Sequence, residues 1–452
     1  MKKERIVILG GGESGTGSAV LAVQKGYDVF LSDRGAIKPE YREILNKHQI
    51  DFEENQHTVD KILQADLVVK SPGIPDDVPL ILQLKDRSIP VISEIEFAGR
   101  YTNARLVAIT GTNGKTTTTL LTYHILKSAG LNVGLAGNVG KSFALQVAES
   151  DHELFVLEVS SFQLDGVYET RFDVGVLLNI TPDHLDRYQN DMQNYIASKF
   201  RLVQNMDQAS TFIFNADSGP VAEKMKTLQL SANKISVSLN NKSGVYVQNN
   251  AMYLSDEVKV NLDELPLQGR HNWINMICAA EAAMAAGLTA GDVARGLKTF
   301  TNAPHRMEKV AEIGGVSFVN DSKATNVDAV YYALESYDQP VIWIAGGKDK
   351  GNDYSALHNL VESKVKAIVA LGADNSKIEK AFKGLAEVFS TDNVEKAVDQ
   401  AYQIAESGEV VLLSPACASF DLFENYEDRG DQFKAAVLKL KKKIDNQLMM
   451  VL

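Results

Sequence analysis

The sequence is poor in cysteine and contains no long apolar run. Only Cys278 and Cys417 occur in 452 residues, and they show no metal-ligand spacing. This scarcity speaks against a disulfide-stabilised secreted scaffold and favours buried, reduced thiols in a cytoplasmic protein. No stretch approaches the roughly 18 apolar residues of a membrane span, so we expect no membrane partner. The apolar run near the N-terminus is short and ends in glycines, which predicts a strand and not a signal peptide.

Positive charge is also scarce. The chain has 46 Lys and Arg residues against 58 Asp and Glu residues, a formal net charge of -12. Nucleic-acid binding normally requires a clustered basic surface, so we expect no nucleic-acid partner. The one basic cluster, KLKKKI at 439–444, has the spacing of a solvated helix face. What remains is an ordinary globular composition, with 45% hydrophobic residues in a chain long enough for two or three domains.

Short β-branched runs alternate with amphipathic segments throughout, which is typical of parallel α/β architecture. We predict three tandem domains: a Rossmann-like domain over 1–98, a central P-loop-type ATPase domain over 99–302, and a Rossmann-like α/β domain over 303–452. Short strands with Asn-, Gly- and Ser-rich turns between about 210 and 262 predict a small antiparallel sheet beside the central parallel one. The proline-containing segment TNAPHRME at 301–308 is predicted to be a linker.

A first glycine-rich loop, ILGGGESGTG, follows the N-terminal strand. Gly10, Gly12 and Gly15 form G-x-G-x-x-G before a predicted helix, and Asp33 follows some eighteen residues later. This pattern provides a tight turn and a helix N-terminus that faces a diphosphate, as in NAD-binding domains. An NAD-dependent oxidoreductase is therefore one hypothesis. Another nucleotide diphosphate would use the same backbone amides, and a plain βα turn would give the same pattern.

A second loop, AITGTNGKTTTT at 108–119, resembles a phosphate-binding loop. The usual G-x-x-x-x-G-K-[ST] pattern would place glycine at Ile109, so this loop is a shorter form. Its glycines free the backbone to wrap phosphate oxygens, Lys115 can reach the β- and γ-phosphates, and a threonine hydroxyl can bind Mg²⁺. A glycine turn with an incidental lysine would not explain why strand, Gly-Lys-Thr order and helix coincide. The predicted ATP loop comprises Gly111, Thr112, Asn113, Gly114, Lys115, Thr116 and Thr117.

Polar residues end the next two predicted strands. Glu158 ends the first, and Asp183 and His184 follow the second. Carboxyl ends of parallel strands line the ligand crevice of an open sheet, and carboxylates suit Mg²⁺. A helix-capping role is the alternative for Glu158. Lys199 lies on the following predicted helix, where a lysine is most often a solvated surface charge.

Three loops of the last third each follow an apolar strand. They are NDSKATN at 320–326, AGGKDKG at 345–351 and SPACASFDLFENYEDRG at 414–430. Together they bring cations and a hydroxyl toward one sheet edge: Lys323, Lys348, Lys350, Ser419 and Arg429. Such a cluster suits a substrate that bears carboxylates, although single loop lysines are usually only solvated.

Taken together, these strings resemble the Mur ligase family of peptidoglycan synthesis over essentially the whole chain. The shared strings are GTNGKTT, GNVG, EVSSFQL, NITPDHLDR, GRHN, APHRME and NDSKATN. SPGI at 71–74 and the 414–430 string resemble the members that add D-glutamate. The resemblance implies a cytoplasmic, monomeric, ATP-dependent amide ligase that joins D-glutamate to UDP-N-acetylmuramoyl-L-alanine through an acyl phosphate. A superfamily ligase for another amino acid is the alternative, although the D-N-P-R string of the diaminopimelate-adding members is absent.

The resemblance also implies roles for matching residues. Catalytic roles fall on Lys115, Glu158, His184 and Lys199. Two Mg²⁺ ions would be held by Thr116, Glu158, His184 and Lys199, the last carbamylated by CO₂. The nucleotide base and ribose would contact Asn272, Asn275, His305, Arg306 and Asp321. The uridine end would contact Ser14, Asp33, Arg34, Ser71 and Gly73, with Asn138, Ser161 and Gln163 near the muramyl substrate. The incoming amino acid would contact Lys323, Thr325, Lys350, Ser419 and Tyr426.

Two departures from the family pattern stand out. Tyr426 occupies a position where phenylalanine is expected, which adds a hydroxyl to the amino-acid pocket. Glu13 and Ser32 replace common residues of the uridine site. An acyl phosphate must be shielded from water, so domain closure with the 301–308 linker as the hinge is also expected.

Overall fold

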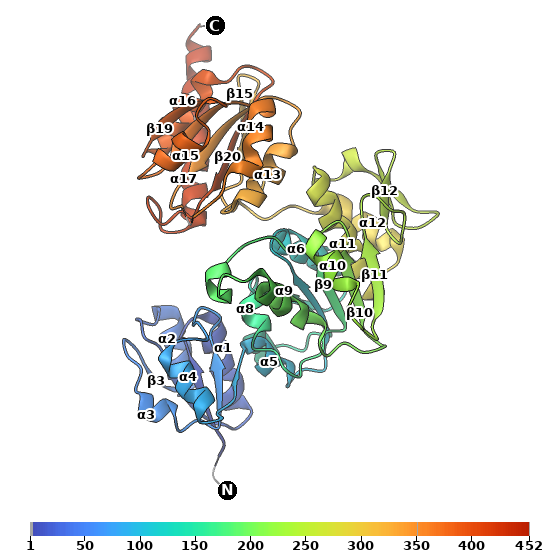
Figure 1. Ribbon diagram of the computed structural model, residues 1–452, viewed down its shortest axis with the longest axis vertical. Helices are drawn as coiled ribbons and strands as arrows, with labels where there is room; N and C mark the ends of the chain where they lie inside the picture. The colour runs from blue at the N-terminus through green and yellow to red at the C-terminus, as the bar shows by residue number, and fades with distance from the viewer. Residues whose placement is uncertain (1–2, 350, 452) are drawn as a thin grey trace. The chain divides into compact units, whose positions relative to one another are not determined.

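The computed structural model describes residues 3–349 and 351–451 (Figure 1). Its first sheet has five parallel strands in the order β3-β2-β1-β4-β5. The strands are β1 Arg5–Leu9, β2 Asp28–Ser32, β3 Asp51–Glu53, β4 Leu67–Lys70 and β5 Val91–Ile92. The helices between them are α1 Glu13–Gln24, α2 Pro39–Lys47, α3 Val59–Ile62 and α4 Pro79–Asp86, and α5 Glu94–Gly99 follows. The predicted Rossmann-like fold is confirmed here.

The central sheet has six parallel strands in the order β11-β10-β9-β6-β8-β7. These are β6 Arg105–Thr110, β7 Val133–Gly137, β8 Leu154–Glu158, β9 Val174–Leu177, β10 Thr211–Asn215 and β11 Asn233–Val237. The helices of this region are α6 Lys115–Ser128, α7 Phe143–Glu149, α8 Ser161–Leu164, α9 Met192–Phe200, α10 Gly219–Met225, α11 Arg270–Ala285 and α12 Ala290–Thr299. Short 3₁₀ turns lie at Leu185–Tyr188, Arg201–Val203 and Leu262–Glu264.

The prediction that the strands from about 210 onward are antiparallel was wrong for the first two. β10 and β11 run parallel and extend the central sheet, because α10 between them provides the crossover that parallel strands require. The antiparallel sheet is smaller than expected, in the order β12-β13-β14. Its strands are β12 Tyr246–Gln248, β13 Ala251–Tyr253 and β14 Lys259–Asn261.

The C-terminal sheet has six strands in the order β15-β16-β20-β17-β18-β19, with only β15 antiparallel. The strands are β15 Glu308–Ile313, β16 Val316–Asn320, β17 Val341–Gly346, β18 Val365–Leu371, β19 Glu387–Thr391 and β20 Val410–Ala416. The helices are α13 Val327–Glu335, α14 His358–Lys364, α15 Ser376–Ala381, α16 Val394–Ile404 and α17 Tyr426–Val451, with a 3₁₀ turn at Ser355–Leu357. The strands β16, β17 and β20, which precede the three loops singled out in the sequence, were predicted, and the edge strands β15 and β19 were not.

The chain divides into two compact units, residues 1–266 with 274–300 and residues 267–273 with 301–452. Within the first unit, α5 joins the two parallel sheets. The buried Glu96 carboxylate accepts hydrogen bonds from the backbone N–H groups of Tyr168, Glu169 and Thr170 at 2.9–3.1 Å. Each bond is charge-assisted and shielded from water, so it is stronger than a surface contact. The predicted domain boundaries at 98 and 302 stay predictions.

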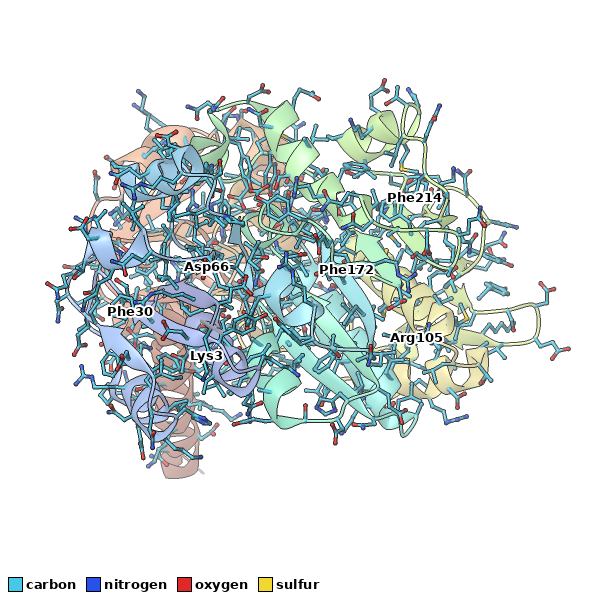
Figure 2. All side chains as sticks on the ribbon, turned by 90° about the horizontal axis from the view of Figure 1, so that it is seen from below. Lys3, Phe30, Asp66, Arg105, Phe172 and Phe214 are labelled. Atoms are coloured by element: carbon cyan, nitrogen blue, oxygen red, sulfur yellow. The ribbon has the colours of Figure 1, made fainter. Side chains whose placement is uncertain are left out.

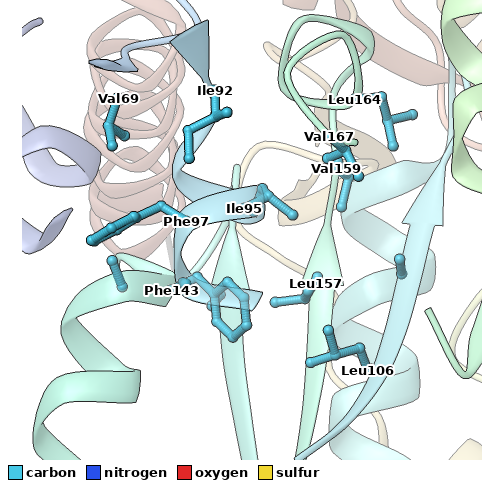
Figure 3. Close-up of a cluster of buried hydrophobic side chains, with 14 of the residues drawn as sticks. Val69, Ile92, Ile95, Phe97, Leu106, Phe143, Leu157, Val159, Leu164 and Val167 are labelled. Carbon is cyan, nitrogen blue, oxygen red and sulfur yellow. The ribbon is translucent and has the colours of Figure 1, made fainter. Parts of the chain in front are cut away.

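One hydrophobic cluster continues from the first sheet into the central one. Figure 3 shows Ile95 and Phe97 of α5 lying between Ile92 of the first sheet and Leu157 of β8. All four side chains are at most 2% exposed. Burial of large apolar side chains is the dominant favourable term in folding, so this shared core ties the first parallel sheet to the central one.

The central layer also anchors its long helix. Arg105, at the start of β6 and labelled in Figure 2, donates to the carbonyl oxygens of Ala285 and Ala286, each at 3.0 Å. A cation at these carbonyls satisfies the orphan acceptors of α11 and complements its dipole.

Both cysteines are buried and free of disulfides, as predicted. Within the described part of the chain, no helix is long and apolar enough to cross a membrane.

Candidate functional site

The predicted phosphate loop lies between β6 and α6, as its sequence indicates. Gly114 is the N-cap of α6 and has φ +83°, in the left-handed region. A Cβ atom at this position would lie 2.4 Å from Asn275 Oδ1 of α11. The loop therefore requires glycine both for its backbone angle and for the space beside it. The same contact places Asn275, a predicted nucleotide residue, next to the loop.

The loop is held open by the segment after β9. Asn179 accepts from the Thr112 backbone N–H through its carbonyl oxygen at 2.9 Å, and its side chain exchanges two hydrogen bonds with the Asn113 backbone at 2.8 and 3.0 Å. Thr181 N–H donates to Thr112 Oγ1 at 3.0 Å. These bonds fix the loop from outside, so its shape does not depend on a ligand. Sequence reasoning missed Asn179, although it stands inside the NITPDHLDR string.

Two lysine side chains converge on one loop carbonyl. Lys115 Nζ donates to Gly111 O at 2.8 Å and to Thr112 O at 2.9 Å, and Lys199 Nζ donates to the same Gly111 O at 2.8 Å. Lys199 is 1% exposed and lies over the Tyr195 ring, so it is not the solvated surface lysine that residue type alone favours. Its role in the site, which the family resemblance implies, stays a prediction.

The environment of Lys199 disfavours its charged form. Burial lowers the pKa of its amine well below the ordinary lysine value, and the neighbouring Lys115 charge acts in the same direction. The carboxylates of Asp183 and Asp165 offset this only in part. A buried lysine of this kind loses its proton readily and becomes a nucleophile.

Glu158 ends β8 beside Ile109 of β6 and Gly137 of β7. Its Oε1 accepts from Asn138 Nδ2 at 2.8 Å, which brings two predicted site residues together. Its Oε2 is buried and has no hydrogen-bond partner among the described residues. An unpartnered buried carboxylate oxygen is costly, and a cation would satisfy it. The alternative role as a helix cap is excluded, because Ser160 caps α8 in a capping box with Gln163.

The other two predicted metal residues, His184 and Thr116, differ in exposure. His184 has φ +51° and a side chain that is 47% exposed, 3.6 Å from the Asp183 carboxylate. Thr116 is buried in the first turn of α6. In the described ranges, no three His, Cys, Asp or Glu side chains form a metal site by themselves. A Mg²⁺ ion here would therefore depend on hydroxyl and phosphate oxygens as well, and the predicted ligand set stays a prediction.

Two predicted muramyl-substrate contacts take part in local structure. The Gln163 side-chain oxygen accepts from Ser160 N–H at 2.9 Å, and the Ser161 carbonyl accepts from Ser198 Oγ at 3.1 Å. Both residues are buried near the start of α8.

A cavity of about 630 Å³ lies in the first domain at the carboxyl ends of its strands. Four predicted uridine contacts line it: Asp33, Arg34, Ser71 and Gly73. Ser14 is not among the lining residues; it contributes a hydrogen bond to the buried Glu94 of α5. Sequence reasoning missed His57, which lines the cavity from the loop after β3 and belongs to none of the family strings.

In the second unit, Asp321 follows β16 and is buried. It accepts from Ser414 Oγ at 3.0 Å and from Met307 N–H at 3.2 Å. Burial raises the pKa of Asp321 to about 7, although Ser414, the Arg306 charge and the Met307 N–H act in the opposite direction. His305 Nδ1 lies 3.0 Å from Asn320 Nδ2. Three predicted nucleotide residues, His305, Arg306 and Asp321, are thus close to one another.

Of the predicted amino-acid contacts, Lys323 lies beside Tyr426, the first residue of α17. Lys323 Nζ lies 4.9 Å from the Tyr426 ring centroid, and the His305 ring meets that ring edge-on at 6.3 Å. Ser419 is buried and Thr325 is partly exposed. Lys350 lies outside the described residues.

Arg429 has a structural role in this region. Its buried guanidinium donates to Ser322 Oγ and O at 2.9 and 2.8 Å and to Cys417 O at 3.2 Å. Its charge therefore supports the loops after β16 and β20.

Comparison with known proteins places this site in a class. Family models match three consecutive segments: a MurD N-terminal domain over residues 5–79, a Mur ligase middle domain over 109–283, and a Mur ligase glutamate ligase domain over 305–417. Solved structures with the same fold include a UDP-N-acetylmuramate-alanine ligase from Thermotoga maritima, at a TM-score of 0.62 and 16% identity, covering 97% of this chain and 100% of that one. A pseudomurein peptide ligase from Methanothermus fervidus has a TM-score of 0.63 and 21% identity, and the match covers 97% of this chain and 100% of that one.

Curated relatives make the assignment more specific. The chain is 51% identical over 443 residues to the UDP-N-acetylmuramoylalanine–D-glutamate ligase of Bacteroides fragilis, covering 97% of this chain and 100% of the relative. The protein of the same name from Bacteroides thetaiotaomicron matches equally, and that from Christiangramia forsetii is 48% identical over 97% of this chain and 100% of its own. The chain belongs to the Mur ligase family, in the branch of the D-glutamate ligases.

The loop geometry generates a first prediction, on Gly114→Ala. A left-handed alanine costs about 1–2 kcal/mol, and its Cβ would displace Asn275, so we expect a lower free energy of unfolding and loss of ATP binding. Calorimetric titration with ATP, together with chemical denaturation, measures both.

Gly130→Ala is the matched control. Gly130 follows the same helix with φ +88° and has open space around its Cβ direction. We expect a similar loss of stability with unchanged ATP affinity. If Gly114→Ala bound ATP as tightly as the wild type, the assignment of the loop would be wrong.

Proposed function

We infer that this protein ligates D-glutamate to UDP-N-acetylmuramoyl-L-alanine with the use of ATP, in the cytoplasm. The observation that carries the inference is the full-length similarity to D-glutamate ligases together with the pre-shaped loop at the start of α6. A uridine diphosphate at the Gly10-Gly12-Gly15 turn would account for that pattern without NAD, and membership of the ligase family replaces the oxidoreductase hypothesis. A monomeric state is also part of the proposal.

Phosphate binding would use the loop and Lys115. The ammonium of Lys115 donates to two neutral carbonyls, and polyphosphate oxygens are stronger, charge-assisted partners for it. Backbone N–H groups at the N-terminus of α6 would face the same oxygens. We propose that these groups stabilise the charge that develops while the substrate carboxylate attacks the γ-phosphorus, and that the D-glutamate amine then displaces phosphate from the acyl phosphate. Asn272, Asn275, His305, Arg306 and Asp321 would hold the base and ribose.

The metal ligands would be Thr116, Glu158, His184 and a carbamylated Lys199. The unpartnered Oε2 of Glu158 fits a divalent cation. Bound Mg²⁺ would neutralise charge on the phosphate oxygens. The buried amine of Lys199, with its lowered pKa, fits attack on CO₂: the nitrogen bonds to carbon and releases a proton. The product would be an anionic oxygen ligand in place of a cation that repels Lys115.

The two remaining substrates would be held by separate groups. We propose that the uridine diphosphate end occupies the 630 Å³ cavity, near Asp33, Arg34, Ser71 and Gly73. Asn138, Ser161 and Gln163 would contact the muramyl part. D-Glutamate carboxylates would pair with Lys323 and Lys350 and accept hydrogen bonds from Thr325, Ser419 and Tyr426.

A panel of amino acids tests the proposed function. Purified protein is given ATP, Mg²⁺ and UDP-N-acetylmuramoyl-L-alanine with D-glutamate, L-glutamate, L-lysine or diaminopimelate, and phosphate release and product mass are measured. We expect both only with D-glutamate. Release with lysine or diaminopimelate, and none with D-glutamate, would assign the protein to another branch of the superfamily.

Dependence on CO₂ tests the role of Lys199. We expect the ligase rate of the wild type to fall when bicarbonate is removed and to recover when it is restored. Lys199→Ala should be slow under both conditions, because it lacks the amine. Lys226→Ala, which removes an exposed lysine, is the control and should respond like the wild type. A wild-type rate that ignores CO₂ would contradict carbamylation.

A further inference from the structure

Three side chains beside the nucleotide cavity form a hydrogen-bond relay that the phosphate chemistry does not use. Ser32 and Glu53 are the last residues of β2 and β3 and pair in register. Ser32 Oγ lies 2.7 Å from Glu53 Oε1 and 2.7 Å from His57 Nδ1. His57 lines the cavity. We call these three residues, Glu53, Ser32 and His57, the base relay.

The direction of each hydrogen bond in the relay follows from Glu53. Burial alone would raise the pKa of its carboxyl, but hydrogen bonds from the Thr58 backbone, the Thr58 hydroxyl and Ser32, with the Lys61 charge, hold it below its ordinary value. The carboxylate is therefore ionised and only accepts. The single hydroxyl proton of Ser32 goes to Glu53 Oε1 at 2.7 Å and not to the Gln56 carbonyl at 3.5 Å. Ser32 Oγ therefore accepts from His57 Nδ1–H.

This arrangement fixes the histidine tautomer. Burial is the largest influence on His57 and lowers its pKa, and the Arg34 charge acts the same way, against the carboxylates of Asp33 and Glu53. A neutral ring carries one proton, and with that proton on Nδ1 the opposite nitrogen, Nε2, is an acceptor. Ser32 is the only hydrogen-bond partner of His57 among the described residues.

Asp33, the acidic residue among those that line the cavity, already accepts from two backbone donors. The Asp33 carboxylate accepts from Gly11 N–H at 2.5 Å and from Gly35 N–H at 2.7 Å, which holds the glycine-rich turn against the end of β2. Of the two groups, His57 Nε2 is the acceptor without a backbone donor already bound to it.

We propose that His57 selects the pyrimidine of the nucleotide substrate by accepting a hydrogen bond from a ring N3–H. Uracil has a proton at N3, whereas cytosine has a lone pair there that would oppose the lone pair of Nε2. Ser32 and Glu53 act as positioning residues that keep the accepting tautomer. The proposal rests on the proposed function, since it assumes that the uridine diphosphate end lies in this cavity.

Calorimetric titration of the full-length protein with UDP and with CDP tests the proposal, at a pH well above the ordinary pKa of histidine. We expect UDP to bind the wild type about tenfold or more tightly than CDP, the effect of one hydrogen bond gained against one opposed. In Ser32→Ala the neutral imidazole can carry its proton on either nitrogen. The ratio of UDP affinity to CDP affinity should therefore fall toward one. His57→Gln should do the same, because a carboxamide donates or accepts by flipping.

Val59→Ala is the matched control, since Val59 lines the same cavity and its apolar side chain can make no hydrogen bond to the relay. It should change the UDP and CDP affinities by the same factor and leave their ratio unchanged. Nitrogen-15 NMR of the imidazole reports which ring nitrogen carries the proton, which a change in packing alone would not alter. We expect a protonated Nδ1 and an unprotonated Nε2 in the wild type, and a mixture in Ser32→Ala.

Equal UDP and CDP affinity in the wild type, or a protonated Nε2, would overturn the proposal. If Ser32→Ala does not fold, the affinities of His57→Gln and the wild-type NMR spectrum still test whether His57 selects the base. A wild type that adds D-glutamate but binds UDP and CDP equally overturns base selection alone. A wild type that binds neither UDP nor UDP-N-acetylmuramoyl-L-alanine overturns the proposed function as well.

Discussion

Two lysine side chains on one backbone carbonyl are the constraint on which the rest of the central site depends. Lys115 and Lys199 both donate to Gly111 O, inside a loop that Asn179 and Thr181 hold open from the other side. Burial lowers the pKa of the Lys199 amine, and the nearby Lys115 charge acts in the same direction. Bound polyphosphate or a carbamate on Lys199 would offset the positive charge of Lys115. The loop is therefore built for anions before any anion binds.

Polar side chains are also held in place by hydrogen bonds in the first domain. Glu53 binds Ser32, and Ser32 in turn binds His57. In the central domain, Glu158 binds Asn138 in a similar way. In both places a buried carboxylate sets the direction of a neighbouring polar side chain. Such preorganisation lowers the entropic cost of binding, because the polar group is already in place when the substrate arrives.

Much of this architecture was predictable from the sequence, for identifiable reasons. Strands β1, β2, β6, β8 and β9 are buried on both faces, so they read as continuous apolar runs. The compact loop at 111–117 was predicted because strand, glycines, Gly-Lys-Thr order and helix are all local features. Edge strands β15 and β19 were missed because their charged, partly exposed residues break the apolar pattern. The parallel direction of β10 and β11 depends on which neighbours they pair with, and local sequence does not contain that information.

The candidate site residues that residue type and spacing do not select share one property. Lys199, Asn179 and His57 each contact partners far away in the chain, such as Gly111 for Lys199 and Ser32 for His57. Only the packing of α9 on the loop shows that Lys199 is buried. Residue type and spacing alone favoured a surface charge there, and the family resemblance was the only signal that selected it.

The central claim is that the loop delivers a γ-phosphate to the carboxylate of the muramyl substrate. Transfer of an oxygen atom from the substrate carboxylate to the released phosphate tests this claim most directly. UDP-N-acetylmuramoyl-L-alanine labelled with ¹⁸O in its alanyl carboxylate is turned over with unlabelled ATP and D-glutamate, and the released phosphate is examined by mass spectrometry. An acyl phosphate requires that one labelled oxygen leaves with each phosphate formed. Phosphate without label, alongside normal amide formation, would contradict the account.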